Sequence, residues 1–483
     1  MISHKDNIIQ FINAEITQMP LTLNSQLTKN GNKINTRDEV DKFKKYIDEF
    51  LEGYEFNRYN ILPGIRGVGK TTILYQLYDY LLNEKKIPQN QILYTSFEDL
   101  NNLVKCNIRE LTETFLETTH ETTTRLLDKK IFLLIDEVNY DPEWAISGKV
   151  LYDRNKNIFM IFTGSSALNF EYNADSARRL NKEIITPLTY GEYIKLKYNL
   201  KCNNLSHALE DLILTGKIDD AVKYEFQTLN TLTNTKNYTN KEWVKYLKYG
   251  GFPELIFVKN HNDISKRLID ISKKVIYVDM PNIKNFTREN QTNANRIIRF
   301  LALQNSGETS QTKLSNYFNT AKSNIKNILD ILEKTHLIFH IEPYGTVSKR
   351  NRGAWKYYFA TSSIKNALAT ERGNTIQKIE QYEGLLLENF IASSLFNFSL
   401  KKFNSFNLYN DGNKESNVDF ILSNDFEKPI PIEVGRGKKD KRQIKNAIKN
   451  YGAEYGIIIS NNEDKIKKED NVIFIPAITF SFL

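Results

Sequence analysis

Gly64-Ile65-Arg66-Gly67-Val68-Gly69-Lys70-Thr71-Thr72 is a complete phosphate-binding loop of the GxxxxGK[ST] type. It follows the apolar pair Ile61-Leu62 and precedes residues 73–82, whose composition predicts a helix, so the motif has the strand–loop–helix context that it requires. Glycines let the backbone curl until successive N–H groups point at phosphate oxygens, and the helix N-terminus adds the positive end of its dipole. We therefore expect Lys70 to neutralise the β- and γ-phosphates of ATP and the Thr71 hydroxyl to bind Mg²⁺. The predicted nucleotide contacts are Gly64, Arg66, Gly67, Gly69, Lys70, Thr71 and Thr72.

A second motif, Lys130-Ile-Phe-Leu-Leu-Ile-Asp136-Glu137, is an apolar run that ends in two acidic residues. Apolar residues without alternation predict a strand buried on both faces of a parallel sheet, and ligands bind at the carboxyl ends of such strands. We expect Asp136 to hold the Mg²⁺ shell and Glu137 to orient or activate the attacking water. The alternative is a core strand followed by a solvated acidic turn, which the earlier phosphate loop disfavours.

Polar residues also follow the next predicted strand, 158–162, at Thr163-Gly-Ser165. Thr163 or Ser165 is expected to hydrogen-bond the γ-phosphate or the attacking water, with a simple turn as the alternative. Arg178 and Arg179 are candidate arginine fingers, supplied in cis or from a neighbouring subunit of a homo-oligomer. Arginines on a solvated helix are the commoner arrangement, and the sequence does not choose between the two residues.

Length and composition limit the number of domains and the class of protein. A chain of 483 residues is too long for one core. It has no apolar run of 18 residues and no evident secretory signal, and its two cysteines form no CxxC pair, so we expect a cytoplasmic protein that does not cross a membrane. The net charge of +8 is mild, but the basic excess lies largely in the second half.

Strand and helix signals alternate from about residue 58 to 170, which predicts an α/β fold with a parallel sheet. Residues 1–40 are polar and turn-rich, and an amphipathic helix is expected over 39–51. We predict four parts: a P-loop ATPase domain (1–190), a helical lid or linker (191–285), a winged-helix domain (286–365) and a nuclease-like α/β domain (375–483).

Three predicted helices (296–303, 311–318 and 321–334) followed by strands at 337–341 and 356–359 form a winged-helix pattern. The third would be the recognition helix, with Lys322 and Lys326 near phosphates or base edges. Basic residues at 348–352 would form the wing. The alternative is a packing or protein-partner module.

The C-terminal part predicts a helix from Gly384, strands near 417–422 and 431–435, and a basic helix at 439–450 that is also expected to grip DNA. Asp419 and Glu433 at adjacent strand ends, with Glu388 on the helix, are the residue types that hold a hard divalent cation. This is the layout of the D…ExK nucleases, in which a lysine supports metal-assisted cleavage. Gly435 stands at that lysine position, so we expect weak or no cleavage unless Lys438 or Lys439 folds back.

These motifs, together with Pro187-Leu-Thr-Tyr-Gly-Glu-Tyr193 and Tyr249-Gly-Gly-Phe-Pro-Glu254, make nearly the whole chain resemble a large family of prokaryotic AAA-type P-loop ATPases with a C-terminal domain of unknown function. The resemblance implies an AAA/STAND-like ATPase core, a helical lid, a winged helix and an end domain related to the PD-(D/E)XK nucleases. The chain departs from the family at Gly435 and near the arginine pair.

Three functions compete. The first is an ATP-driven switch or motor acting on DNA or a DNA-bound partner, which the acidic pair and the basic second half favour. The second is an ATP-gated nuclease in defence against mobile elements, which Gly435 opposes. The third is a STAND-like signalling or scaffold ATPase that recruits a protein partner.

Overall fold

The computed structural model describes residues 3–29, 31–164, 179–282, 286–304, 309–352, 354–371, 379–401, 406–411, 417–424, 427–435 and 441–483. The chain divides into two compact units, Met1–Thr186 and Pro187–Leu483. Each unit is described by itself. The four parts expected from the sequence stay a prediction.

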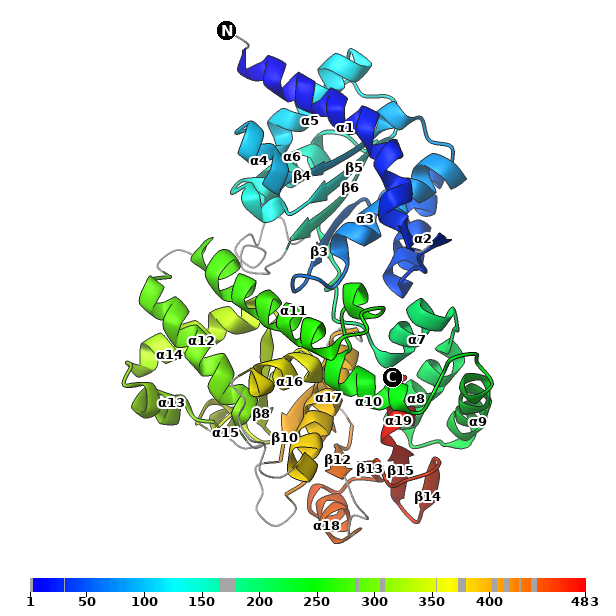
Figure 1. Cartoon of the computed structure of the whole chain (residues 1–483), viewed down its shortest axis with the longest axis vertical. Coiled ribbons are helices and arrows are strands. Elements are labelled where there is room, and N and C mark those ends of the chain that lie inside the picture. The colour runs from blue at the N-terminus through cyan, green and yellow to red at the C-terminus, as the bar shows by residue number, and fades with distance from the viewer. Residues whose placement is uncertain are drawn as a thin grey trace. The chain divides into compact units, whose positions relative to one another are not determined.

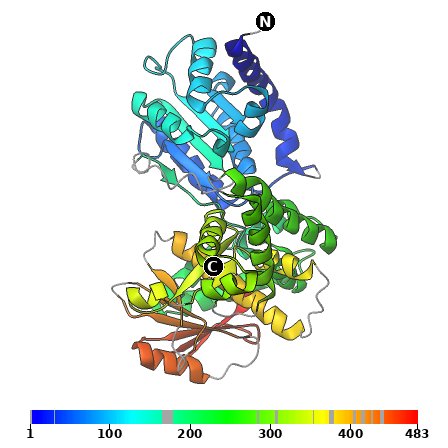
Figure 2. The ribbon, with the colours of Figure 1, turned by 90° about the vertical axis from the view of Figure 1, so that its left-hand side faces the viewer.

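The first unit is built on a five-stranded sheet in the order β4-β5-β6-β3-β7, and all of its strand pairs are parallel (Figures 1 and 2). Strands β3, β5 and β6 are buried along their whole length, and for β5 the unbroken apolar sequence predicted this burial. The α/β parallel-sheet fold expected from the sequence is therefore present. The strands are β3 (Tyr59–Pro63), β4 (Ile92–Ser96), β5 (Ile131–Asp136), β6 (Ile158–Gly164) and β7 (Asn181–Lys182).

Helices accompany these strands in the expected alternation. The helix after the phosphate loop ends in a single π-helical turn, Tyr80–Glu84, and the helix before β5 ends at His120. The helices are α2 (Asp38–Glu52), α3 (Lys70–Asp79), α4 (Phe97–Leu103), α5 (Ile108–His120) and α6 (Trp144–Arg154).

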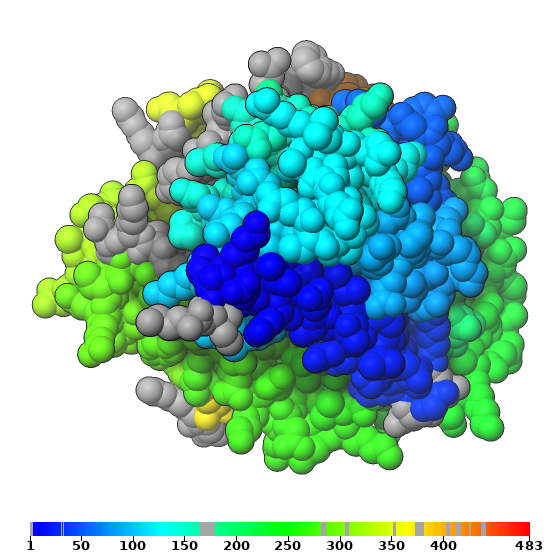
Figure 3. Space-filling model, turned by 90° about the horizontal axis from the view of Figure 1, so that it is seen from above, coloured from blue at the N-terminus to red at the C-terminus, as the bar shows by residue number. Residues whose placement is uncertain are grey.

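The prediction that residues 1–40 are turn-rich was wrong. Residues His4–Leu27 form helix α1, which begins at a capping box between Ser3 and Asp6 and lies across the surface of this unit (Figure 3). Its apolar residues form no sharply defined stripe, and Pro20 lies inside it, so the sequence signal for a helix is weak. Packing against α3, β4 and α5 buries Ile8 and Ile12, and this tertiary contact stabilises the helix. Two short strands, β1 (Thr28–Lys29) and β2 (Asn32–Lys33), follow.

The second unit begins with helices that surround α16 (Ser362–Thr370). This helix packs against α10, α11, α12 and α17, and the hydroxyls of Ser362 and Ser363 donate to the carbonyls of Leu247 and Gly250 at 2.6 Å. The helices before the hairpin are α7 (Tyr190–Tyr198), α8 (Asn203–Thr215), α9 (Asp219–Thr233), α10 (Lys241–Tyr249), α11 (His261–Lys274), α12 (Arg288–Leu303), α13 (Gln311–Phe318) and α14 (Lys322–Lys334).

An antiparallel hairpin of β8 (Ile338–Pro343) and β9 (Lys356–Phe359) follows α14. The segment between its strands contains a short helix, α15 (Val347–Arg352), where the sequence predicted a basic wing. The Arg350 guanidinium donates to the Gly345 carbonyl at 3.0 Å and to the Tyr409 hydroxyl at 2.9 Å. At least this member of the predicted wing therefore packs against the protein.

The same hairpin extends a larger sheet. Strand β10 pairs in parallel with β8, which gives an eight-stranded mixed sheet in the order β14-β15-β13-β12-β11-β10-β8-β9. The predicted winged-helix and nuclease-like parts therefore share one sheet. Its other elements are α17 (Ile379–Lys401), β10 (Asn407–Asn410), β11 (Phe420–Ser423), β12 (Ile430–Gly435), α18 (Lys441–Tyr451), β13 (Gly456–Ser460), β14 (Lys467–Glu469), β15 (Val472–Pro476) and α19 (Ala477–Phe480).

Candidate nucleotide-binding site

The phosphate loop joins the buried end of β3 to the start of α3. Gly67 and Gly69 have φ values of 84° and 96°, a region that glycine adopts at little cost, and Gly69 caps α3. Gly64 is required for a different reason, because a Cβ at this position would lie 2.3 Å from the Ile185 carbonyl oxygen. Local backbone geometry therefore explains why glycine stands at three positions of the motif.

Lys70 opens α3 and is only 5% exposed. Its ammonium group donates to the carbonyl of Gly64 at 2.8 Å and to that of Ile65 at 3.3 Å. The lysine side chain thus folds over its own loop, with its charge inside the curve that the motif predicts for phosphates.

Asp136 lies next to this loop at the carboxyl end of β5. Its carboxylate accepts hydrogen bonds from the hydroxyls of Thr71, at 2.6 Å, and Thr163. Strand order explains the meeting, because β6 lies between β5 and β3 and brings Thr163 beside both strand ends. The sequence predicted Thr71, Asp136 and Thr163 as functional residues, and the fold brings all three together.

Burial and the neighbouring Glu137 raise the pKa of Asp136, while the hydroxyls of Thr163 and Thr71 and the charge of Lys70 act in the opposite direction. A hydroxyl and a carboxylate 2.6 Å apart are both oxygen donors of the type that Mg²⁺ prefers. The donor set therefore fits the ion that the motif implies.

Glu137 follows in the left-handed region, with φ 52° and ψ 49°. This conformation is uncommon outside glycine and asparagine. Its backbone N–H donates to Thr163 Oγ1 at 3.1 Å, so the threonine contacts both residues of the acidic pair. The half-buried Glu137 side chain therefore starts from a backbone held beside Asp136.

Other predicted residues have mixed surroundings. Arg66 lies beside the hydroxyl of Tyr140, and this hydroxyl donates a hydrogen bond to Glu98 at 3.0 Å. Thr72 is half-buried in the first turn of α3. Arg179 forms an ion pair with Asp153, with 2.6 Å between the nitrogen and oxygen atoms. Ser165 and Arg178 lie outside the described residues. The arginine-finger role of Arg178 or Arg179 stays a prediction, and so does the contact of Thr163 or Ser165 with the γ-phosphate or the attacking water.

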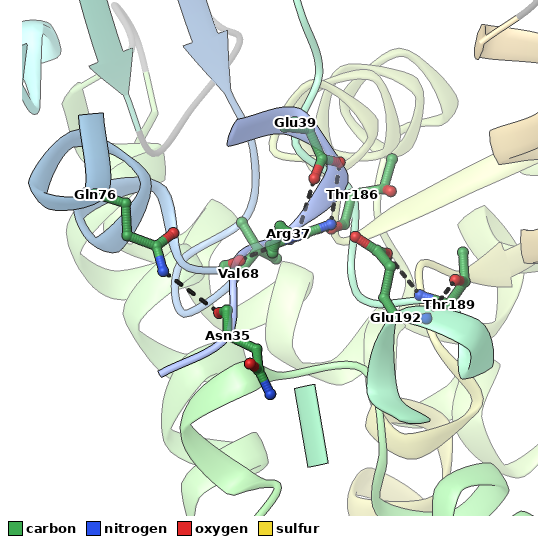
Figure 4. A network of polar contacts seen from close by, with 8 residues as sticks. All are labelled: Asn35, Arg37, Glu39, Val68, Gln76, Thr186, Thr189 and Glu192. Carbon is green, nitrogen blue, oxygen red and sulfur yellow. Dashed lines mark hydrogen bonds and ion pairs between the residues drawn. The ribbon is translucent and has the colours of Figure 1, made fainter. Parts of the chain in front are cut away.

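Sequence reasoning missed one buried residue near the loop, Arg37. It is 4% exposed and donates to the Val68 carbonyl at 2.8 Å (Figure 4). It precedes α2 in a stretch interpreted as turn-rich, and no motif distinguishes it.

The C-terminal carboxylates form a second group of predicted site residues. Asp419 immediately precedes β11 and accepts the Val434 N–H at 2.7 Å, while Glu388 on α17 accepts the Tyr358 hydroxyl at 2.8 Å. The pKa of Asp419 is raised well above its usual range. Burial is the largest cause, and the negative charges of Glu388 and Glu433 act in the same direction, whereas the positive charge of Lys356 lowers the pKa.

These carboxylates thus lie close enough to affect one another. Within the described part of the chain, however, no group of three or more His, Cys, Asp or Glu side chains is arranged to hold a metal ion. The metal role of Glu388, Asp419 and Glu433 stays a prediction. Lys438 and Lys439 lie outside the described residues.

Comparison with known proteins agrees with the loop geometry. A family model described as an AAA domain matches residues 56–194, and models of two domains of unknown function match residues 240–377 and 383–480. The uncharacterized protein MJ1637 of Methanocaldococcus jannaschii is 32% identical over 473 residues, which cover 98% of this chain and 93% of that protein. The chain belongs to the family of MJ1637.

Other proteins are less similar to this chain. The uncharacterized protein MJ1544 of the same organism is 24% identical over 461 residues, 92% of each chain. Among solved structures, the Aeropyrum pernix ORC1 protein in complex with DNA is similar with 10% identity and a TM-score of 0.30, over 73% of this chain and 97% of that one. In this MJ1637-family protein, none of the described helices has both the length and the apolar character needed to cross a bilayer.

Proposed function

We propose that the protein is a Mg²⁺-dependent ATPase that acts as a nucleotide-driven switch or motor on DNA or a DNA-bound partner. The observation that supports this best is the convergence of Lys70, Thr71, Asp136 and Thr163 at one loop on an AAA-type sheet.

Each residue then has a separate task. Thr71 and Asp136 offer oxygen ligands to Mg²⁺, and Lys70 leaves its loop carbonyls to meet the β- and γ-phosphates. Thr163 holds the Asp136 carboxylate and the Glu137 backbone, so that Glu137 orients the attacking water. ATP with Mg²⁺ supplies an activated phosphoryl group, and the protein supplies positioning and charge.

The DNA part of the proposal rests on α14. Three helices followed by a hairpin is the order of a winged helix, and α14 buries Ile325, Ile328 and Leu329 on one side while Lys322 and Lys326 are exposed. Arg350 is not a DNA contact in this proposal, because its guanidinium binds Gly345 and Tyr409. The remaining basic residues leave a smaller DNA surface than the sequence suggested.

The ATPase rate with no DNA, with duplex DNA and with single-stranded DNA tests the proposal. We expect Mg²⁺-dependent turnover that rises with at least one form of DNA. Absence of nucleotide binding would reject the ATPase assignment, and turnover that ignores both forms of DNA would reject the DNA assignment.

A second candidate is an ATP-gated nuclease. The observation in its favour is Lys356 on β9, whose charge lowers the pKa of Asp419 against the effect of burial. A lysine from the hairpin would then supply the cation that is missing at Gly435.

A further inference from the structure

Arg37 is the centre of a buried polar network in the first unit (Figure 4). Its guanidinium donates to the Val68 carbonyl at 2.8 Å, to the Thr186 carbonyl at 3.1 Å and to the Glu39 carboxylate at 3.1–3.2 Å. Glu39 is 8% exposed, so this ion pair is largely shielded from water. One side chain thus holds a carbonyl of the phosphate loop and a carbonyl 118 residues later in the chain.

The Val68 carbonyl matters because of the peptide that it belongs to. In a trans peptide the C=O and the following N–H point in opposite directions, so a carbonyl held by Arg37 aims the Gly69 N–H to the other side of the backbone. A phosphate loop binds its ligand through such N–H groups. Arg37 therefore fixes the orientation of a ligand-binding peptide without facing the ligand.

The Thr186 carbonyl ends a segment that runs along the same strand. Beyond β7, the N–H groups of Glu183 and Ile185 donate to the carbonyls of Ile61 and Pro63 at 2.9 and 2.8 Å. The Ile185 carbonyl also occupies the space that a side chain on Gly64 would need. Residues 181–186 are thus bonded to β3 and packed against the loop as far as the last residue of the first unit.

The backbone is anchored again two residues later, inside the second unit. There the Leu188 N–H donates to the Gly251 carbonyl at 2.8 Å, and the Leu188 carbonyl accepts the Tyr246 hydroxyl at 2.6 Å. The next residue, Thr189, forms a capping box with Glu192 and starts α7 (Figure 4). The hydrogen bonds of the second unit therefore begin at Leu188.

We propose that Arg37 is a positioning residue that couples nucleotide binding at the phosphate loop to the backbone segment 181–186. The inference rests on the proposed nucleotide binding. When a ligand reorganises the loop peptides, the Val68 carbonyl and the Thr186 carbonyl respond together because they share one guanidinium. The segment at the end of the first unit then changes its hydrogen bonding with nucleotide state.

Arg58 provides a matched control. It is 5% exposed and donates to the carbonyls of Tyr152 and Asn155 at 2.7 and 3.1 Å, but it has no bond to the phosphate loop. Arg58→Ala therefore removes a buried guanidinium with a similar number of carbonyl partners. It separates a loss of stability from a loss of coupling.

The test is amide hydrogen exchange of the full chain, with and without Mg²⁺ and a non-hydrolysable ATP analogue, combined with titration of analogue affinity. In the wild type we expect the analogue to change the exchange rates of the Glu183 and Ile185 amides. Arg37→Ala should weaken affinity by about tenfold, in line with the loss of charge-assisted hydrogen bonds, and should abolish the change at 183–185. Arg58→Ala should keep both.

Arg37→Lys should restore affinity in part, because an ammonium lacks the planar fork that serves several acceptors at once. If Arg37→Ala does not fold, Glu39→Gln tests the same link, since it keeps the side-chain length and removes the charge that orients Arg37.

Unchanged affinity and unchanged exchange in the Arg37 or Glu39 variants would overturn the inference, and so would equal losses in the Arg37 and Arg58 variants. A wild type that binds the analogue without a change at 181–186 rejects the coupling alone. A wild type that binds no nucleotide rejects the proposed function.

Discussion

The phosphate loop and the C-terminal carboxylates were both predicted from residue types, and the structure treats them differently. At the loop, Lys70, Thr71 and Asp136 meet with hydrogen bonds that explain their types. At the C-terminal group, Glu388 and Glu433 raise the pKa of Asp419 in addition to burial, yet the described residues hold no metal-type cluster.

The difference lies in how each site is encoded. The loop is nine consecutive residues whose glycines set the backbone, so the sequence itself specifies most of the geometry. The carboxylates come from α17, the residue before β11, and β12, and their mutual placement depends on the packing of the whole sheet. A motif that is local in sequence supports stronger predictions than one assembled by tertiary structure.

The largest effect should come from Lys70→Ala. Loss of its charge-assisted contacts to phosphate, worth 1.5–3 kcal/mol each, should weaken ATP affinity by about 100-fold or more. Equilibrium titration with a fluorescent ATP analogue measures this. Lys365→Ala is the control, because Lys365 is also buried and donates to the Leu301 carbonyl at 3.2 Å in the second unit. Equal affinities for the two variants would contradict the loop assignment.

Glu137→Gln should separate binding from turnover. The amide cannot activate water, so kcat should fall by about 100-fold or more while ATP affinity stays near the wild-type value. Steady-state phosphate release and analogue titration measure the two quantities. Glu143→Gln, an exposed change in the next segment, should leave both unchanged. Wild-type turnover in Glu137→Gln would show that another residue positions the water.

A smaller effect is expected at α14. The double variant Lys322→Ala/Lys326→Ala should lower the slope of log affinity against log salt by about 1.8, since each duplex phosphate contact contributes roughly 0.9. Gel-shift titrations at several salt concentrations measure the slope. Lys223→Ala/Lys241→Ala removes the same charge from exposed sites on α9 and α10 and serves as the control. Unchanged slopes would leave α14 as a packing or partner element.

His340 in the hairpin should affect stability with pH. It stacks on Trp355 with ring centroids 3.9 Å apart. Burial lowers its pKa, but Glu333 and then Glu342 together outweigh burial, so the pKa is raised. Because the folded pKa exceeds the unfolded value, its ion pairs stabilise the fold fully below about pH 6.5 and the benefit is lost as pH rises through the folded pKa.

The melting temperature at pH 5.5 and pH 8.5 measures this for the wild type and for His340→Phe, which keeps a flat ring against Trp355. We expect the wild type to exceed the variant by a few degrees at pH 5.5 and by less at pH 8.5. A difference that does not depend on pH would assign His340 to packing alone.

The smallest expected effect concerns cleavage. With Mn²⁺ and ATP, we expect little or no nicking of plasmid DNA by the wild type and no change in Asp419→Ala or Glu433→Ala. Robust nicking that both substitutions abolish would restore the nuclease candidate. Lys356→Ala would then show whether the lysine on β9 takes the place of Gly435.

The same distinction between local motifs and tertiary contacts explains which features could be predicted from the sequence. The parallel sheet, the loop and its acidic partners followed from unbroken apolar strands and fixed spacing. Helix α1 did not, because it contains Pro20 and is stabilised by tertiary contacts with α3, β4 and α5. Arg37 was not predicted either, because its proposed role depends on a contact with Thr186, which lies far away in the chain.

The parallel pairing of β10 with β8 has a practical consequence for anyone who divides this chain. A fragment beginning at α17 would leave β10 without β8, one of its two neighbours, and expose the backbone N–H and C=O groups on that edge of the strand to solvent. Unprotected edges of this kind recruit strands from other molecules and promote aggregation. A soluble fragment of the C-terminal half therefore needs to start upstream of β8, although the matches to two separate family models, at 240–377 and 383–480, invite a cut between them.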